Sequence, residues 1–461
     1  MQEQKAMDGA GLRPWLQLSL CEGIGPLRAA RLLAQFGTPQ AVLQQPLPLL
    51  QQALGSAVLA QRLLQPDEAA LQAALARLQQ WLGQADADLG LAHAVWTLDD
   101  PRYPLALRQL DDPPLLLYAV GPRAWLGAQA PMPWWQCCGP MLAMVGSRQP
   151  TAQGAQNARH FAQQLQELGV CIVSGLARGI DAAAHEGALL AQQGAEPGAR
   201  PATIAVMGTG ADRIYPAAHR ALARRIAQHG LLLSEQPLGM LPLATNFPRR
   251  NRIITGLSQA VLVVEAAEKS GSLISARLAA EQGRDVLAIP GSIHSPQSRG
   301  CHALIKQGAK LVDCVADVLE ELAGPGAPHV APDLAPDAVQ DVAPDAAAAQ
   351  AVLRAAAGQG GQAQPPEGEL APAPAPAPAA EHAATAAPPA QPKPLRPQQS
   401  KPQGPQQALL EAMGFDPVSL EQLQARTGLP TAQLQALLLD LELAQAVARM
   451  PGGWFQRLGL G

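Results

Sequence analysis

The stretch LAMVGSRQPTAQGAQNARHFAQQLQELGVCIVSGLARGID (142–181) contains two short apolar runs separated by an amphipathic segment. The runs LAMV and VCIV are apolar at every position, as is typical of strands that are buried on both faces of a parallel sheet. Between them, apolar residues recur at helical spacing and predict a helix with one buried face: Ala158, Phe161, Ala162, Leu165 and Leu168. The stretch therefore predicts a strand–helix–strand unit.

The same alternation continues to residue 323. The further apolar runs are TIAVM, LLLSE, AVLVVE, VLAIPG and AKLVDC, and most are separated by Ala/Leu/Gln-rich helical segments. This pattern predicts an α/β fold, a Rossmann-like doubly wound parallel sheet within residues 91–323. We expect the approach segment 97–121 to be Pro-rich and irregular, and the segment with Trp134, Trp135, Cys137 and Cys138 to be a surface loop. Ligands of such a sheet bind at the carboxyl ends of its strands.

Three further regions flank this domain. Residues 12–90 have a mostly helical pattern, and CEGIGPLRAARLLAQFG (21–37) resembles a helix-hairpin-helix, although an accessory helical domain with an ordinary glycine turn explains it as well. Residues 324–405 hold 18 of the 44 prolines and no aromatic residue, which predicts an extended, disordered linker.

Residues 406–458 resemble a winged helix. Its expected recognition segment, 431–443, lacks Lys and Arg, which favours a protein-contact or regulatory role over reading of duplex sequence.

Composition and motifs exclude several classes of protein. The 461 residues carry 33 Lys+Arg against 37 Asp+Glu, so the chain is not generally basic. No secretory signal or apolar run of membrane-spanning length is visible, and the six cysteines lack C-x-x-C spacing, so we expect a cytoplasmic protein with reduced thiols. There is no P-loop motif, and GTGADR (208–213) matches the dinucleotide fingerprint poorly. We expect no cofactor, no metal site and no catalytic residue.

Three predicted strand-to-helix loops carry residues suited to an anion. Glycines let backbone N–H groups approach a ligand there, and the helix N-terminus adds positive partial charge. The candidates are Gly146, Ser147 and Arg148 after the first strand, Ser174, Gly175, Arg178 and Gly179 after the second, and Lys269, Ser270, Gly271 and Ser272 after AVLVVE. Asp181 is out of place beside an anion, and a helix N-cap would explain it.

The stretch NFPRRNRIITGLS (246–258) concentrates three arginines, Arg249, Arg250 and Arg252. The window 246–310 contains nine basic and four acidic residues, whereas the whole chain has a net charge of −4. We expect Arg250 and Arg252 to contact phosphates. Phe247 could stack on a base or be a core residue that holds the loop.

Five segments together resemble the DNA-processing protein A (DprA/Smf) family: GSRxPT, SGLARGIDAAAHEGAL, NFPRRNRIITGLS, VVEAAEKSGSLISARLAAEQGRDVLAIPG and RGCHALIKQGAKLV. The resemblance covers about residues 143–313. It implies a non-catalytic cytoplasmic protein that binds and protects incoming single-stranded DNA in natural transformation, forms a homodimer and loads the RecA recombinase. Mapped onto the matching positions, the expected DNA contacts are Gly146, Ser147, Arg148, Ser174, Gly175, Gly179, Phe247, Arg250, Arg252, Lys269, Ser270 and Gly271.

Two other classes of function remain open from the residues. Phosphoribohydrolases on a similar fold also bind phosphate at such loops. Those enzymes, however, carry the pattern P-G-G-x-G-T-x-x-E, which supplies a catalytic Glu. The only PGG here is 451–453, with no such Glu after it, and Glu265 and Glu268 lack a matched motif. The other class is a dimeric scaffold without a ligand.

Overall fold

The structure, a computed structural model, describes residues 9–84, 89–127, 130, 132–192, 200–323, 404–415, 417–444, 446–450 and 453–458. The expected linker, 324–405, therefore lies outside the described residues except for its last two positions. Among the described helices, none is both long and apolar enough to span a membrane.

The centre of the fold is a nine-stranded sheet with the order β1-β2-β6-β5-β4-β3-β7-β8-β9. The strands from β6 to β9 in this order are all parallel to their neighbours. Their bounds are β3 Met141–Gly146, β4 Cys171–Ser174, β5 Thr203–Val206, β6 Leu231–Ser234, β7 Ala260–Glu265, β8 Asp285–Ala288 and β9 Lys310–Leu311. The expected Rossmann-like α/β fold is confirmed.

Two antiparallel strands extend the sheet, and the second of them lies where the sequence predicted an irregular approach. Strand β1 (Leu91–Thr97) pairs with β2 (Leu116–Pro122), and β2 pairs antiparallel with β6. The prediction was wrong for 116–121, because the prolines just before this stretch are typical of a loop. Pro113 and Pro114 lie before the first residue of β2, so they remove no N–H group from its hydrogen-bond ladder. The connection contains only a short helix, α7 (Leu105–Arg108).

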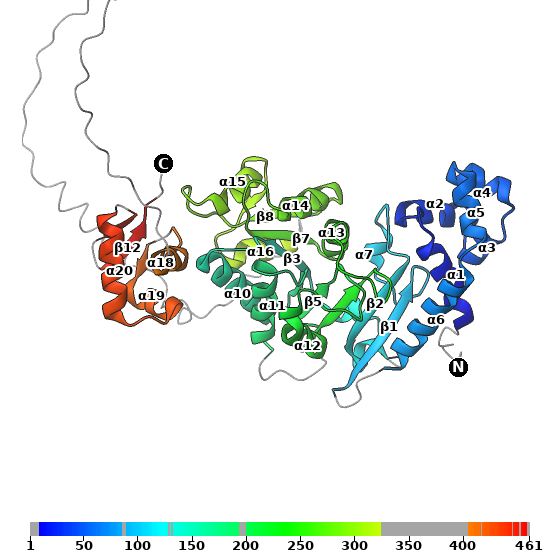
Figure 1. Ribbon diagram of the computed structural model, residues 1–461, viewed down its shortest axis with the longest axis horizontal. Helices are drawn as coiled ribbons and strands as arrows, with labels where there is room; N and C mark the ends of the chain where they lie inside the picture. The colour runs from blue at the N-terminus through cyan, green and yellow to red at the C-terminus, as the bar shows by residue number, and fades with distance from the viewer. Residues whose placement is uncertain are drawn as a thin grey trace, which may run out of the picture. The chain divides into compact units, whose positions relative to one another are not determined.

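Helices cover both faces of the sheet (Figure 1). One face carries α10 (Ala152–Glu167), α11 (Ile180–Leu190), α12 (Arg220–His229) and α16 (Val315–Ala323), and the other carries α13 (Asn246–Leu257), α14 (Ser272–Glu281) and α15 (Arg299–Lys306). In β3, Leu142 and Met144 belong to the core under α10, whereas Ala143 and Val145 belong to the opposite core. This alternation explains why each strand is apolar throughout.

Helix α10 forms as its periodicity predicts, with one exception. Its N-cap Thr151 accepts a hydrogen bond from Gly154 N at 2.9 Å, and the predicted residues from Ala158 to Leu165 are buried. Leu168 is 47% exposed, because the helix ends at Glu167 and Leu168 is its C-cap.

The expected surface loop with two tryptophans instead packs on the sheet. Trp134 begins the short helix α9 (Trp134–Cys137), is fully buried and stacks on Trp96 with ring centroids 6.2 Å apart. A second short helix, α8 (Arg123–Leu126), precedes it. All six cysteines are unpaired thiols.

The N-terminal region is helical: α1 Gly9–Leu20, α2 Pro26–Phe36, α3 Pro39–Leu43, α4 Leu47–Leu54, α5 Ala57–Leu64 and α6 Glu68–Gly83. Its core includes Trp15, Leu32, Leu63 and Leu78. Gly23, Ile24 and Gly25 connect α1 to α2, which begins at Pro26.

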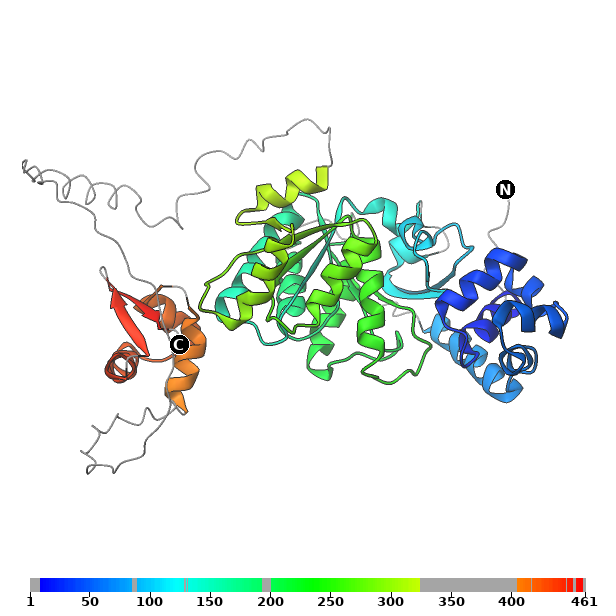
Figure 2. The same cartoon turned by 90° about the horizontal axis from the view of Figure 1, so that it is seen from above.

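The C-terminal region forms a small domain with a core of its own. Its elements are α18 Pro405–Met413, β10 Val418–Ser419, α19 Leu420–Thr427, α20 Thr431–Leu443, β11 Val447–Met450 and β12 Trp454–Arg457. Strands β11 and β12 form the expected antiparallel wing, visible in red in Figure 2. A capping box of Ser419 and Gln422 starts α19. The expected winged helix is confirmed.

Candidate functional site

A groove of about 1080 Å³ lies at the carboxyl edge of the parallel strands. The connection after β3 runs to β4 on one side, whereas β7 lies on the other side of β3, so the groove is at the switch point of the sheet. Ten of the fourteen predicted residues line it: Gly146, Ser147, Arg148, Gly175, Arg178, Phe247, Arg250, Ser270, Gly271 and Ser272. This volume lies near the upper end of the range of small-molecule sites, about 300–1,000 Å³.

The wall of the groove combines positive charge with an aromatic ring. Arg148 is exposed, and its guanidinium carbon lies 6.0 Å from the centre of the Phe247 ring. Phe247 is half-buried, and its ring centroid lies 5.5 Å from that of Tyr215. Among the described residues, no carboxylate lies within ion-pair distance of Arg148 or Arg178. Both cations are therefore open to an anionic ligand.

Arg250 forms part of the groove lining as a buried cation. It is 4% exposed, and its Nη1 donates to the carbonyl oxygen of Val206 at 2.6 Å. Burial lowers the pKa of Arg250 to about 10, against the opposing effect of the Asp181 charge, so the side chain remains protonated at neutral pH. The guanidinium passes directly over Gly175, where a Cβ atom would overlap Nη1. Gly175 is thus required by the packing of Arg250.

Asp181 organises the loop after β4 instead of capping α11. The N-cap of α11 is Gly179, and the Asp181 carboxylate accepts hydrogen bonds from Gly175 N at 3.1 Å and Ala177 N at 3.3 Å. Burial raises the pKa of Asp181, although the Arg250 charge opposes that shift. The N–H group of Gly175, which the sequence assigned to a ligand, is therefore already bonded within the protein.

Gly179 joins two of the loops that line the groove. Its φ of +83° is favoured by glycine, and a Cβ atom there would overlap the carbonyl oxygen of Ser147. The next residue, Ile180, donates its N–H to that same oxygen at 3.1 Å. The close approach fixes the loop after β3 against the start of α11.

The loop after β7 presents two hydroxyl groups at the start of α14. The Oγ atoms of Ser270 and Ser272 are 2.7 Å apart, and Ser272 N donates to Ser270 Oγ at 3.3 Å. Gly271 is exposed, with open space where a Cβ would be. Since α14 begins at Ser272, its positive N-terminal end lies at the groove.

Four predicted residues do not line the groove. Ser174 is fully buried and its Oγ donates to the Met144 carbonyl oxygen at 2.6 Å, so the side chain is committed to the core. Gly179 serves the loop junction described above. Lys269 is exposed beside Ser270 but outside the lining. The fourth residue is Arg252.

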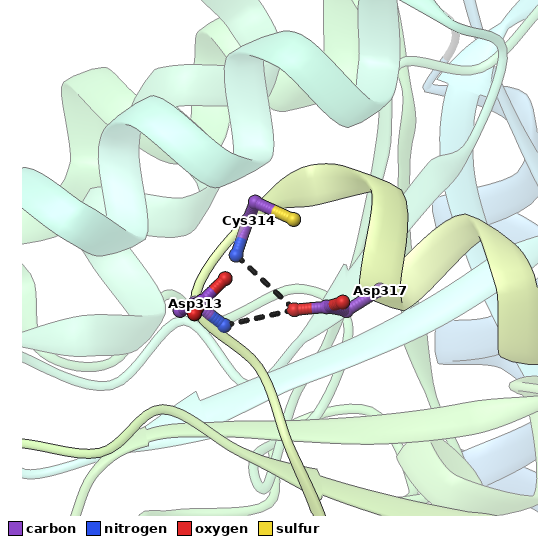
Figure 3. Close-up of side chains that lie close together, drawn as sticks. All are labelled: Asp313, Cys314 and Asp317. Carbon is purple, nitrogen blue, oxygen red and sulfur yellow. Dashed lines mark hydrogen bonds between the residues drawn. The ribbon is translucent and has the colours of Figure 1, made fainter. Parts of the chain in front are cut away.

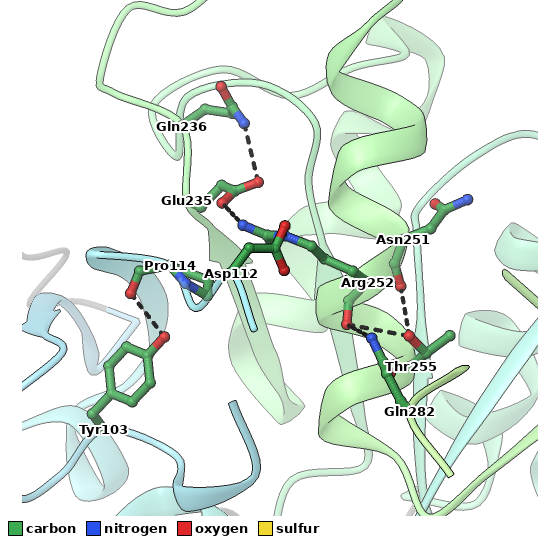
Figure 4. A network of polar contacts seen from close by, with 9 residues as sticks. All are labelled: Tyr103, Asp112, Pro114, Glu235, Gln236, Asn251, Arg252, Thr255 and Gln282. Atoms are coloured by element: carbon green, nitrogen blue, oxygen red, sulfur yellow. Dashed lines mark hydrogen bonds and ion pairs between the residues drawn. The ribbon is translucent and has the colours of Figure 1, made fainter. Parts of the chain in front are cut away.

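Arg252 lies in a buried ion-pair network away from the groove lining (Figure 4). Its Nε donates to Asp112 Oδ2 at 2.8 Å and its Nη2 to Glu235 Oε2 at 2.6 Å. The Arg252 and Glu235 side chains are 8% and 9% exposed. Burial raises the pKa of Glu235 although Arg252 opposes it, whereas the two carboxylates raise the pKa of Arg252 against the effect of burial. Its position corrects the expected phosphate contact, because the guanidinium ties α13 to the loops before β2 and after β6.

Comparison with known proteins settles the family. Residues 94–323 match the family described as DNA recombination-mediator protein A, and residues 370–453 match the DprA winged helix domain. The DNA processing protein DprA of Streptococcus pneumoniae is 46% identical over 222 residues, which are 48% of this chain and 72% of that protein. The chain belongs to the DprA family.

Two further comparisons agree with this membership in the DprA family. Protein Smf of Escherichia coli is 52% identical over 182 residues, which span 39% of this chain and 46% of that protein, so the match covers about half of that relative. The X-ray structure of DprA from Streptococcus pneumoniae has a TM-score of 0.54 at 35% identity, covering 68% of this chain and 98% of that one. The resemblance seen in the sequence is confirmed.

Several groove residues of this DprA-family chain escaped the sequence reasoning. Tyr215 lies in the loop between β5 and the 3-10 helix η1 (Ala217–His219). This loop is at the same edge of the sheet as the predicted loops, so topology could have indicated it. Asn251 is one helical turn after Phe247, so helical spacing could have found it. Gln297 reaches the groove from a distant segment, and nothing in the sequence pattern marks it.

The polar clusters outside the groove have structural explanations. Asp313, Cys314 and Asp317 lie together at the start of α16, where Asp317 Oδ2 accepts hydrogen bonds from Asp313 N and Cys314 N at 3.0 and 3.3 Å (Figure 3). These bonds lower the pKa of Asp317 and cap the helix.

His185 is fully buried, with Nδ1 2.7 Å from Thr203 Oγ1, and burial lowers its pKa to about 3. This histidine is therefore neutral.

Proposed function

We propose that this chain binds single-stranded DNA in the groove at the carboxyl edge of its sheet. The observation that carries the proposal is the convergence there of Arg148, Arg178, the N-terminus of α14 and the half-buried Phe247 ring. Cations and helix N-termini suit phosphates, and an aromatic ring suits an unpaired base. The family description as a DNA recombination mediator and the names of its relatives support the same class of ligand.

A single strand fits these features better than a duplex. A duplex hides the faces of its bases, so a ring inside a groove could not stack on them, whereas a single strand exposes every base. In the winged helix, α20 carries no Lys or Arg, so the helix that would enter a major groove lacks the usual base-reading cations. The phosphate contacts position the strand without reading its sequence.

The wider role that we propose is protection of incoming DNA in the cytoplasm during natural transformation, as a homodimer that loads the RecA recombinase. The resemblance to the family and the description of a recombination mediator support it. A test is RecA filament assembly on single strands coated with single-strand-binding protein, which the chain should accelerate. Equal assembly rates with and without it would contradict the loading role.

The chain acts, in this proposal, by binding and not by catalysis. The Glu265 carboxylate is 5% exposed and accepts hydrogen bonds from Thr151 Oγ1 at 2.7 Å and Thr151 N at 3.0 Å, so it is bonded to the N-cap of α10. A phosphoribohydrolase would need such a carboxylate free to act at the substrate. Incubation with nucleoside monophosphates should release no free base, and enzyme-dependent release would favour the hydrolase.

The direct test is a titration of a fluorescent single-stranded oligonucleotide followed by anisotropy. We expect saturable binding that weakens as salt rises, and weaker competition by duplex of the same sequence. Binding of duplex at least as tight as that of single strands would contradict the proposal. Absence of binding to either would favour the scaffold.

A further inference from the structure

A second concentration of arginine lies outside the predicted site. Between Asp212 and Glu235 the chain has no acidic residue but contains four arginines. Arg213 lies in the loop before η1, and the other three lie on α12 and are called the α12 basic face: Arg220, Arg224 and Arg225. All four are exposed. In a chain with a net charge of −4, such a segment is a local excess of positive charge.

The packing of α12 directs its three arginines toward solvent. Its apolar residues Leu222, Ala223, Ile226 and Ala227 are buried under the sheet face, and the remaining positions are largely exposed. Arg220 and Arg224 are one helical turn apart, which corresponds to about 6 Å of rise. They therefore form a short basic row along the outer surface of the helix.

No acidic partner neutralises this row. Among the ion pairs of the described residues, none includes an arginine of the α12 basic face. Partly exposed arginines elsewhere do find partners, as Arg159 does with Glu186 at 2.8 Å and Arg13 with Glu68 at 2.7 Å. Unpaired like charges on one helix repel one another, and a polyanion relieves that repulsion.

The α12 basic face is continuous with the groove. Tyr215, Pro216, Ala217 and Ala218 line the groove, and the 3-10 helix η1 leads from them directly into α12 at Arg220. His219 Nδ1 lies 3.0 Å from the carbonyl oxygen of Leu176, which holds this turn against the loop after β4. The first arginine of the helix, Arg220, is thus two residues from the groove lining at Ala218.

We propose that a single strand leaving the groove passes over Tyr215 and continues along the α12 basic face, where Arg220 and Arg224 contact its phosphates. This inference rests on the proposed function, because it extends the same binding site. The groove holds the first nucleotides, and the helix face lengthens the site for longer strands.

The test compares a short and a long oligothymidine, of roughly 6 and 20 nucleotides, which bracket the site sizes of single-strand binders. The full-length protein and the double variant R220A/R224A are titrated with each. We expect unchanged affinity for the short strand and about tenfold weaker affinity for the long one. The salt slope for the long strand should become shallower by roughly 1.4, since two phosphate contacts are lost.

The matched control is R277A/K306A, which removes one exposed cation from α14 and one from α15. Neither Arg277 nor Lys306 lines the groove. It should leave both affinities unchanged, which separates local contacts from total charge. Wild-type affinities for both strands retained by a folded R220A/R224A protein would overturn this inference alone. If wild-type protein bound neither strand, the proposed function itself would fail.

Discussion

Replacement of Arg252 by Ala should destabilise the protein without removing a DNA contact. The guanidinium is 8% exposed and joins Glu235, 9% exposed, to Asp112, which is 40% exposed. In the variant, the Glu235 carboxylate would remain buried without its cation. The loss of one partner of a buried pair is costly because the remaining charge is desolvated and uncompensated.

The expected magnitude follows from this burial. Breaking a buried ion pair costs about 3–5 kcal/mol, and Glu235 is buried enough for that range to apply. For a domain of about 200 residues, each kcal/mol lowers the melting temperature by roughly 2–4 °C. The variant should therefore melt about 6–20 °C below the wild type. The comparison variant R13A breaks a pair whose members are 37% and 56% exposed, and its melting temperature should stay close to that of the wild type.

Thermal unfolding followed by circular dichroism measures the loss of stability in R252A. Oligonucleotide anisotropy at 10 °C, where the variant is folded, measures its DNA affinity, which should equal that of the wild type. The double variant R252M/E235Q should recover part of the lost stability, because it removes the unpaired charge. A melting temperature within about 2 °C of wild type, together with about a tenfold loss of DNA affinity, would contradict a structural role for Arg252. It would return Arg252 to the phosphate-binding role that the sequence suggested.

Three other variants test separate parts of the account. R148A should weaken single-strand binding at least about tenfold and reduce the salt slope by roughly 0.7, and an unchanged slope would mean that Arg148 meets no phosphate. F247L should lower oligothymidine affinity by about 1–3 kcal/mol through lost stacking, and unchanged affinity would assign the ring to packing alone. Truncation after Ala323 should keep affinity within about tenfold, or roughly 1.4 kcal/mol, of the full chain, and a larger loss would place a principal DNA site in the tail.

The parallel half of the sheet was predictable because its strands are buried on both faces. Each is a short, nearly continuous apolar run between glycine or proline, and helical spacing separates the runs, so periodicity alone identifies the elements. The antiparallel strand β2 was predicted to be irregular, because prolines beside a strand resemble those within a loop. The burial of Trp134 was missed for a related reason. Its partner Trp96 lies 38 residues earlier in the chain, and no local pattern marks such a pair.

The groove was predictable from topology more than from individual residues. Loops after parallel strands meet at one edge, so Arg148, Arg178 and Ser272 could be brought together from sequence. The direction of individual side chains could not be predicted from the topology. Arg250 and Arg252 are two positions apart on α13 and point about 160° apart around the helix axis, so they reach different surroundings. The Asp112 partner of Arg252 is 140 residues away, and only the folded chain reveals it.

Photo-crosslinking tests directly whether single-stranded DNA occupies the groove. The full-length protein is irradiated with an oligonucleotide carrying 5-iodouracil, and the modified peptides are mapped by mass spectrometry. We expect adducts on the peptides that contain Tyr215 and Phe247, the two aromatic rings at the groove. Adducts confined to residues 9–84 or 404–458, with neither groove peptide modified, would contradict the claim.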